Sequence, residues 1–114
     1  MHEFSLVRTL LQQVDRVVAD HGGRAAVAVC VEVGPLSGVE PLLVKSAFEQ
    51  LSDTSSARGA TLSIDEVPLT AKCSACDSEF EVIDFRFACP ACGSGETQTI
   101  RGDAFRLMSV TTEA

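Results

Sequence analysis

The first part of the chain repeats apolar residues at intervals of three and four positions. These residues are Leu6, Val7, Leu10, Leu11, Val14, Val17 and Val18. Charged and amide side chains fill most of the positions between them. This spacing predicts an amphipathic helix, which we expect to begin at about Ser5, as its cap, and to end at the Gly22-Gly23 pair.

After Arg24 the apolar spacing changes to two, which is typical of a strand. The valines at 27, 29, 31 and 33 are expected to share one face of it. A second helix is predicted from Pro41 to about Leu51, because proline is tolerated in a first helical turn and apolar residues again recur at helical intervals. Alternating patterns predict two more strands, over 60–67 and 103–112, and Met108 of the last strand is expected in the core.

The segment between these last two strands, 72–100, has little apolar periodicity of its own. It holds four of the five cysteines of the chain. We expect it to form a small separate lobe that cannot bury enough surface to fold alone. A bound metal would then have to supply the missing stability.

The overall composition limits the kinds of partner. Hydrophobic residues make up 46% of the 114 residues, so one compact core is expected, and the formal net charge is −7. The nine basic residues are scattered, which argues against a nucleic-acid surface. The chain shows no apolar run of membrane-spanning length and no signal-peptide pattern. We therefore expect a cytoplasmic protein with no membrane span, in a compartment that keeps thiols reduced.

Two Cys-x-x-Cys pairs carry the clearest chemistry in the sequence. Cys73 and Cys76 form the first pair, Cys89 and Cys92 form the second, and twelve residues separate the pairs. A two-residue gap lets a tight turn point both sulfurs to one side, and two such turns facing each other give tetrahedral sulfur coordination, which suits Zn²⁺ or iron. Four protein ligands leave no open position, so we expect a structural zinc site.

Three other interpretations of the cysteines carry less weight. Two disulfides are disfavoured in a reducing compartment. A redox Cys-x-x-Cys usually opens a helix after a strand, and a pair of such units fits a metal better. Rubredoxin-type iron shares the geometry, but Asp77 follows Cys76 where a glycine-aromatic pair would be expected, and the chain has no Tyr or Trp.

The N-terminus holds a second candidate metal site, Met1-His2-Glu3. A free amino group, the next backbone amide and an imidazole at position 2 can form fused chelate rings around one ion. Planar nitrogen ligation of this kind suits Ni²⁺ or Cu²⁺ better than zinc. The initiator Met1 is expected to be retained because His2 is large.

Met1-His2-Glu3, the amphipathic first helix, the Phe48-Glu49 helix and the inserted cysteine pairs occur here in one order. This combination resembles the hydrogenase nickel-incorporation family, HypA/HybF, over essentially the whole chain. The resemblance implies an α+β fold, a small three-stranded sheet packed by two helices with an inserted all-Cys zinc-ribbon lobe. We assign 1–70 plus 101–114 to a nickel-binding α+β domain and 71–100 to the zinc-binding lobe.

The resemblance also implies roles for single residues. His2 would be the essential nickel ligand, Met1 would contribute its terminal amine, and Glu3 its amide or carboxylate. Glu40 matches a position that is acidic in some relatives, where it would bind nickel or orient His2; the alternative is a carboxylate that stabilises the N-terminus of the second helix. Some relatives carry histidines beside the cysteine pairs, whereas this chain has Asp77-Ser78 and Gly93-Ser94.

The function implied is that of a nickel metallochaperone for NiFe-hydrogenase, and in some organisms for urease. Its expected partners are the hydrogenase large subunit and a nickel-handling GTPase, and formation of a homodimer is left open. Zn²⁺ would be structural and Ni²⁺ the cargo. The alternative is a zinc-ribbon interaction module that carries no metal. An enzyme is not expected, because the sequence shows no catalytic constellation and no phosphate-binding loop.

Overall fold

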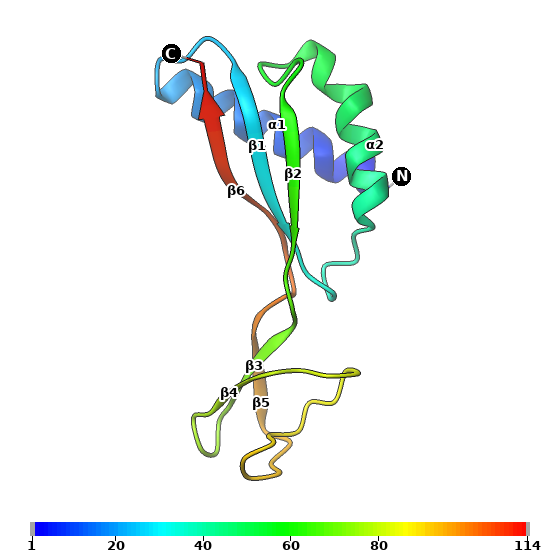
Figure 1. The fold of residues 1–114 in the computed structure, drawn as a ribbon, viewed down its shortest axis with the longest axis vertical. Helices are drawn as coiled ribbons and strands as arrows, with labels where there is room; N and C mark the ends of the chain where they lie inside the picture. Colours follow the sequence, from blue (N-terminus) through cyan, green and yellow to red (C-terminus); the bar gives the residue numbers. More distant parts are fainter. Residues whose placement is uncertain (1, 114) are drawn as a thin grey trace.

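The computed structural model describes residues 2–113 and has two lobes (Figure 1). A narrow neck joins them, where the chain around Gly34, Leu69 and Gly102 comes together. The molecule measures 52 × 29 × 17 Å, and its Cα radius of gyration is 17.1 Å. A compact domain of this length would have a radius of gyration of about 13 Å. The excess comes from the second lobe, which extends away from the first.

The larger lobe is a three-stranded sheet covered on one face by two helices. Its elements are α1 (His2–Asp20), β1 (Ala26–Val33), α2 (Pro41–Leu51), the 3-10 turn η1 (Ser52–Thr54), β2 (Thr61–Glu66) and β6 (Phe105–Thr112). The strand order is β2-β1-β6, with β1 parallel to β2 and antiparallel to β6. The first and last parts of the chain therefore meet in one sheet.

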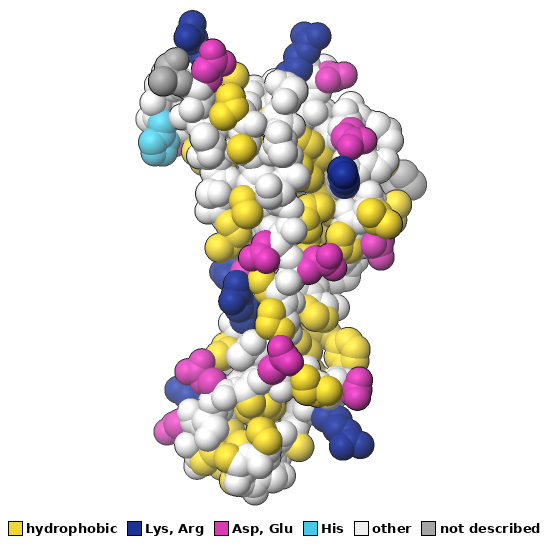
Figure 2. Space-filling view, viewed as in Figure 1, with side chains coloured by type: hydrophobic (Ala, Val, Ile, Leu, Met, Phe, Trp, Pro, Cys, Tyr) yellow, Lys and Arg dark blue, Asp and Glu magenta, His cyan; other side chains and the backbone are white. Residues whose placement is uncertain are grey.

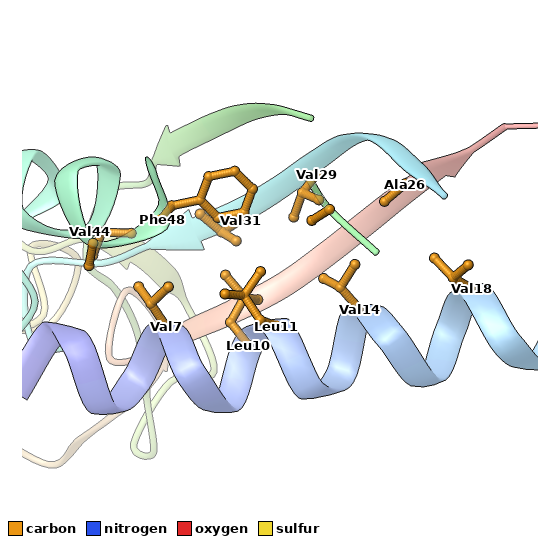
Figure 3. Packing of buried hydrophobic residues seen from close by; sticks show 12 residues of the cluster. Val7, Leu10, Leu11, Val14, Val18, Ala26, Val29, Val31, Val44 and Phe48 are labelled. Carbon is orange, nitrogen blue, oxygen red and sulfur yellow. The ribbon is translucent and has the colours of Figure 1, made fainter. Parts of the chain in front are cut away.

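The core of this lobe lies between the helices and the sheet. From α1, side chains such as Val7, Leu10 and Val14 point toward β1 (Figure 3). Phe48 of α2 lies against Val31 of β1 and is 3% exposed. The two helices thus bury their apolar sides against a single central strand.

Three details differ from the sequence-based expectation. Helix α1 begins at His2, so Ser5 lies inside the helix and is not its cap. In β1 a register shift between Ala26 and Ala28 reverses the alternation, which leaves Val27 45% exposed and buries Ala26. The prediction that Met108 is a core residue is wrong, because a second register shift in β6 turns it outward and leaves it 49% exposed.

The smaller lobe is also built on a sheet, which the sequence did not predict. Its strands are β3 (Thr70–Cys73), β4 (Glu79–Glu81) and β5 (Thr97–Arg101), in the antiparallel order β4-β3-β5. Leu69, Ala71 and Val82 form its buried cluster, with Phe80 and Phe87 packed against it. A cluster of this size cannot offset the entropy of ordering some thirty residues, so the lobe needs another source of stability.

The expected fold class is confirmed: an α+β chain with a three-stranded sheet, two helices and an inserted lobe that contains the cysteines. The division at 70/71 and 100/101 stays a prediction; the second sheet begins at Thr70 and ends at Arg101. Within the described residues no helix is both long and apolar enough to cross a membrane.

Candidate metal centres

The two Cys-x-x-Cys segments fold into matching turns. In the first turn, the amide of Cys73 donates to the carbonyl of Ser78, and the amide of Asp77 donates to the carbonyl of Cys73, both at 2.8 Å. In the second turn, the amide of Cys89 donates to the carbonyl of Ser94 and the amide of Gly93 to that of Cys89, at 2.9 and 2.7 Å. The two halves of the site therefore share one backbone pattern.

The residue after each pair adopts a left-handed conformation. Its φ is +76° at Gly93 and +62° at Asp77. Glycine adopts this region without strain, and aspartate tolerates it better than most residues. The departure at Asp77 noted in the sequence thus leaves the turn intact.

We predict that Gly93→Ala weakens the site. A side chain in the left-handed region costs about 1 kcal/mol, or roughly fivefold in zinc affinity. Competition with a chromophoric chelator measures this loss. Gly95→Ala is the matched control, because Gly95 has open space around it and no positive φ. Equal affinities of the two variants would contradict the assigned backbone role of Gly93.

The four sulfurs converge on one point. The Sγ atoms of Cys73, Cys76, Cys89 and Cys92 all lie within 4.8 Å of one another. Sγ of Cys73 is 3.6 Å from that of Cys92, and Sγ of Cys76 is 3.6 Å from that of Cys89. A tetrahedron with Zn–S bonds of about 2.3 Å has edges of about 3.8 Å, so the donor set fits zinc.

The setting of the cysteines supports thiolate ligation. Cys73 and Cys89 are buried, whereas Cys76 and Cys92 face solvent. Hydrogen bonds with the side chain and then the backbone of Ser78 lower the pKa of the Cys76 thiol to about 6, whereas the Cys73 thiol and burial raise the pKa of Cys92. The metal-free cluster therefore ionises first at Cys76. Metal ligation requires this thiolate form.

The other candidate residues lie where α1 begins and meets α2. His2 is exposed in the first turn of α1, and Glu3 is partly buried. The amide of Glu40 donates to Oε2 of Glu3 at 3.2 Å. This hydrogen bond is the main cause that lowers the pKa of Glu3. Glu3 and Glu40 are thus neighbours, although 36 residues separate them in the sequence.

Glu40 caps the second helix. Its side chain accepts a hydrogen bond from the amide of Leu42 at 3.4 Å, and Pro41 occupies the first helical turn. This is the alternative role that the sequence analysis gave it, and a role of Glu40 toward nickel stays a prediction.

The side chains of the described N-terminal candidates do not converge on one point. Among residues 2–113, the four cysteines are the one group of three or more potential ligands that lie within reach of a shared ion. His2 is not grouped in this way with Glu3 and Glu40, and Met1 lies outside the described residues. Nickel ligation by Met1, His2 and Glu3 stays a prediction. His2 is the first residue of α1, so its amide has no hydrogen-bond partner within the helix.

One charged cluster was not predicted from the sequence. Glu32 of β1 is 2% exposed and accepts hydrogen bonds from Arg101 and Arg106. The available signal was a single carboxylate in a strand that is otherwise nearly all Val and Ala. Cys30, the fifth cysteine, is partly buried on the same strand and is not part of the sulfur cluster.

An α+β lobe joined to a four-sulfur lobe defines a two-lobed metal-binding protein. The family model described as hydrogenase/urease nickel incorporation, metallochaperone, HypA matches residues 1–112. The chain belongs to this family of nickel metallochaperones.

Curated relatives and solved structures agree with the family. The hydrogenase maturation factor HypA of Nitrosospira multiformis is 37% identical over 110 residues, which is 96% of each chain. That of Aquifex aeolicus is 36% identical over 113 residues, which is 99% of this chain and 98% of the relative. The solution structure of the nickel metallochaperone HypA from Helicobacter pylori shares the fold, with a TM-score of 0.77, 24% identity, and coverage of 98% of this chain and 97% of that one. A second solution structure of a HypA protein has a TM-score of 0.78 at 26% identity, and 99% of this chain and 97% of that one are covered.

Proposed function

We propose that this chain binds one Ni²⁺ at its N-terminus and delivers it to NiFe-hydrogenase during maturation. The observation that carries the proposal is the family match, which spans residues 1–112 and so includes both the N-terminal triplet and the cysteine lobe. This full-length match favours a metallochaperone over a zinc-ribbon module that carries no metal.

The two metals would have different roles in this protein. The sulfur site has four protein ligands and no open position, so it suits a permanent structural zinc. The cargo site would lie in the larger lobe, at the start of α1 and apart from the cysteine lobe, with the amine of Met1, the amide of His2 and the His2 imidazole as nitrogen ligands. Planar nitrogen coordination suits Ni²⁺. Because His2 is exposed, a recipient protein could approach the ion directly.

Glu3 would tune this site and Glu40 would support it. The Glu40 amide donates a hydrogen bond to the Glu3 carboxylate, and this bond links the start of α1 to the start of α2. Glu3 could offer its amide or a carboxylate oxygen to the ion. Glu40 would act indirectly, by fixing Glu3.

The remaining parts of the proposal follow from the family. The partners would be the hydrogenase large subunit and a nickel-handling GTPase, with urease as a further recipient, in the cytoplasm. The chain would act as a carrier and not as an enzyme, since delivery of an ion requires binding and release but no bond-breaking step.

Complementation tests the function in cells that lack their own factor of this family. We expect the wild-type chain to restore nickel to the hydrogenase large subunit and His2→Ala to fail, at equal protein levels. His21→Ala is the matched control, because His21 is the exposed histidine just beyond the other end of α1 and hydrogen-bonds only to the Val17 carbonyl. Full nickel loading of the hydrogenase by His2→Ala would contradict the proposal.

A further inference from the structure

Glu32 stands out as a buried carboxylate held by two cations. Arg101 donates to its Oε1 from Nε at 3.3 Å and from Nη2 at 3.0 Å. Arg106 donates to its Oε2 from Nε at 3.0 Å. The arginine side chains are 47% and 56% exposed, whereas that of Glu32 is 2% exposed. Figure 2 shows a group of Lys and Arg side chains, in dark blue, on one side of the neck, with acidic side chains close by.

The two arginines belong to different lobes. Arg101 is the last residue of β5, in the cysteine lobe, and Arg106 lies in β6, directly opposite Glu32 of β1 in the larger sheet. The Glu32–Arg106 contact is therefore internal to the larger lobe. The Glu32–Arg101 contact crosses from one lobe to the other, and both contacts end on one carboxylate.

Backbone contacts close the neck around this cluster. The amide of Leu36 donates to the carbonyl of Gly102 at 2.9 Å, and the amide of Gly34 donates to that of Ala104 at 3.1 Å. A Cβ at Gly34 would overlap the backbone of Gly102, and a Cβ at Gly102, whose φ is +98°, would lie 2.7 Å from Cα of Leu69. Three chain segments thus meet where a side chain would not fit.

The neck and the N-terminal end of the molecule share one short segment. After Gly34 the chain runs six residues to Glu40, whose amide is bonded to Glu3. A change in the orientation of the cysteine lobe would pull on the same loop that positions the start of α2. The neck is therefore positioned to set the orientation of the cysteine lobe relative to the start of α1.

Stability alone does not account for a buried ion cluster. Desolvation of a carboxylate offsets much of the attraction it gains, and apolar residues of similar volume often stabilise a fold as well or better. A buried charge does, however, require its partners in one geometry, because leaving it unpaired is costly. Such a cluster selects one arrangement of the parts it joins.

We propose that Glu32 is a positioning residue that, through Arg101, locks the cysteine lobe in one orientation relative to the larger lobe. The lock is a property of the neck and does not depend on nickel. Glu32 and Arg106 form the fixed half of it within the larger sheet, and Arg101 is the part contributed by the cysteine lobe.

Residual dipolar couplings of the zinc-loaded full chain test this directly. In the wild type, amides of both lobes should fit one alignment tensor. In Arg101→Gln, the cysteine lobe should give a smaller alignment tensor than the larger lobe, so that the two lobes no longer fit one tensor. Glu32→Gln should have the same effect.

The control variants distinguish a loss of the fixed lobe orientation from a general loss of stability. Arg106→Gln removes a contact within the larger lobe, so it should keep one common tensor even if it lowers the melting temperature. Asp65→Asn changes an exposed carboxylate beside Glu32 on β2 and should behave as wild type. If Glu32→Gln does not fold, Arg101→Gln still decides, because Arg101 is half exposed. A single tensor in folded Arg101→Gln, or equal loosening by Arg106→Gln, would overturn the proposal.

Discussion

We expect removal of zinc to unfold the cysteine lobe and to leave the larger lobe folded. The buried cluster of the lobe is small, and its strands are three to five residues long, so the metal must provide most of its stability. Zinc binding by four thiolates contributes about 10–16 kcal/mol to folding in small zinc domains. Cys89→Ser, which removes a buried ligand, should have the same effect as a chelator.

Amide NMR spectra measure this outcome lobe by lobe. Signals from β3, β4 and β5 should collapse to unfolded positions in Cys89→Ser, while those of α1 and β1 remain dispersed. Cys30→Ser is the matched control, since Cys30 lies outside the sulfur cluster, and it should retain one zinc per chain. A folded, metal-free cysteine lobe would show that the sulfur site is not structural.

Nickel binding should fall at least about a hundredfold in His2→Ala, while zinc content and fold stay unchanged. Replacing a residue that only orients a metal ligand costs 10- to 100-fold, and removal of a ligand should cost no less. Calorimetric titration with Ni²⁺ measures the change, and His21→Ala should bind as the wild type does. Unfolding or zinc loss in His2→Ala would contradict the site assignment, because His2 is exposed and is not part of the hydrophobic core.

The parts of the fold predicted from sequence are those with long, regular patterns. Helix α2 and the strands of the larger sheet were expected near their observed bounds, because their apolar periods are sustained over several turns or pleats. Strands β3, β4 and β5 were not predicted. They are short, and they have no sustained apolar pattern of their own; β3 runs directly into the first cysteine turn.

Long-range contacts account for the remaining differences. The sulfur cluster was predictable because the Cys-x-x-Cys spacing specifies a local turn, whichever way the lobe is placed. The ion cluster around Glu32 was not predictable, because Arg101 and Arg106 lie 69 and 74 residues further along the chain. Likewise, register shifts in β1 and β6 decide that Val27 and Met108 face outward, and no local pattern specifies where a bulge falls.

The central claim is that this chain carries nickel on its own N-terminus, apart from zinc. The most direct measurement is nickel and zinc content per chain, after nickel loading, for untagged protein that begins at Met1 and for the same protein with one glycine added before Met1. We predict one zinc in both, and one nickel only in the protein that begins at Met1, because the added residue converts the terminal amine into an amide. Equal nickel content in the two proteins would contradict the claim.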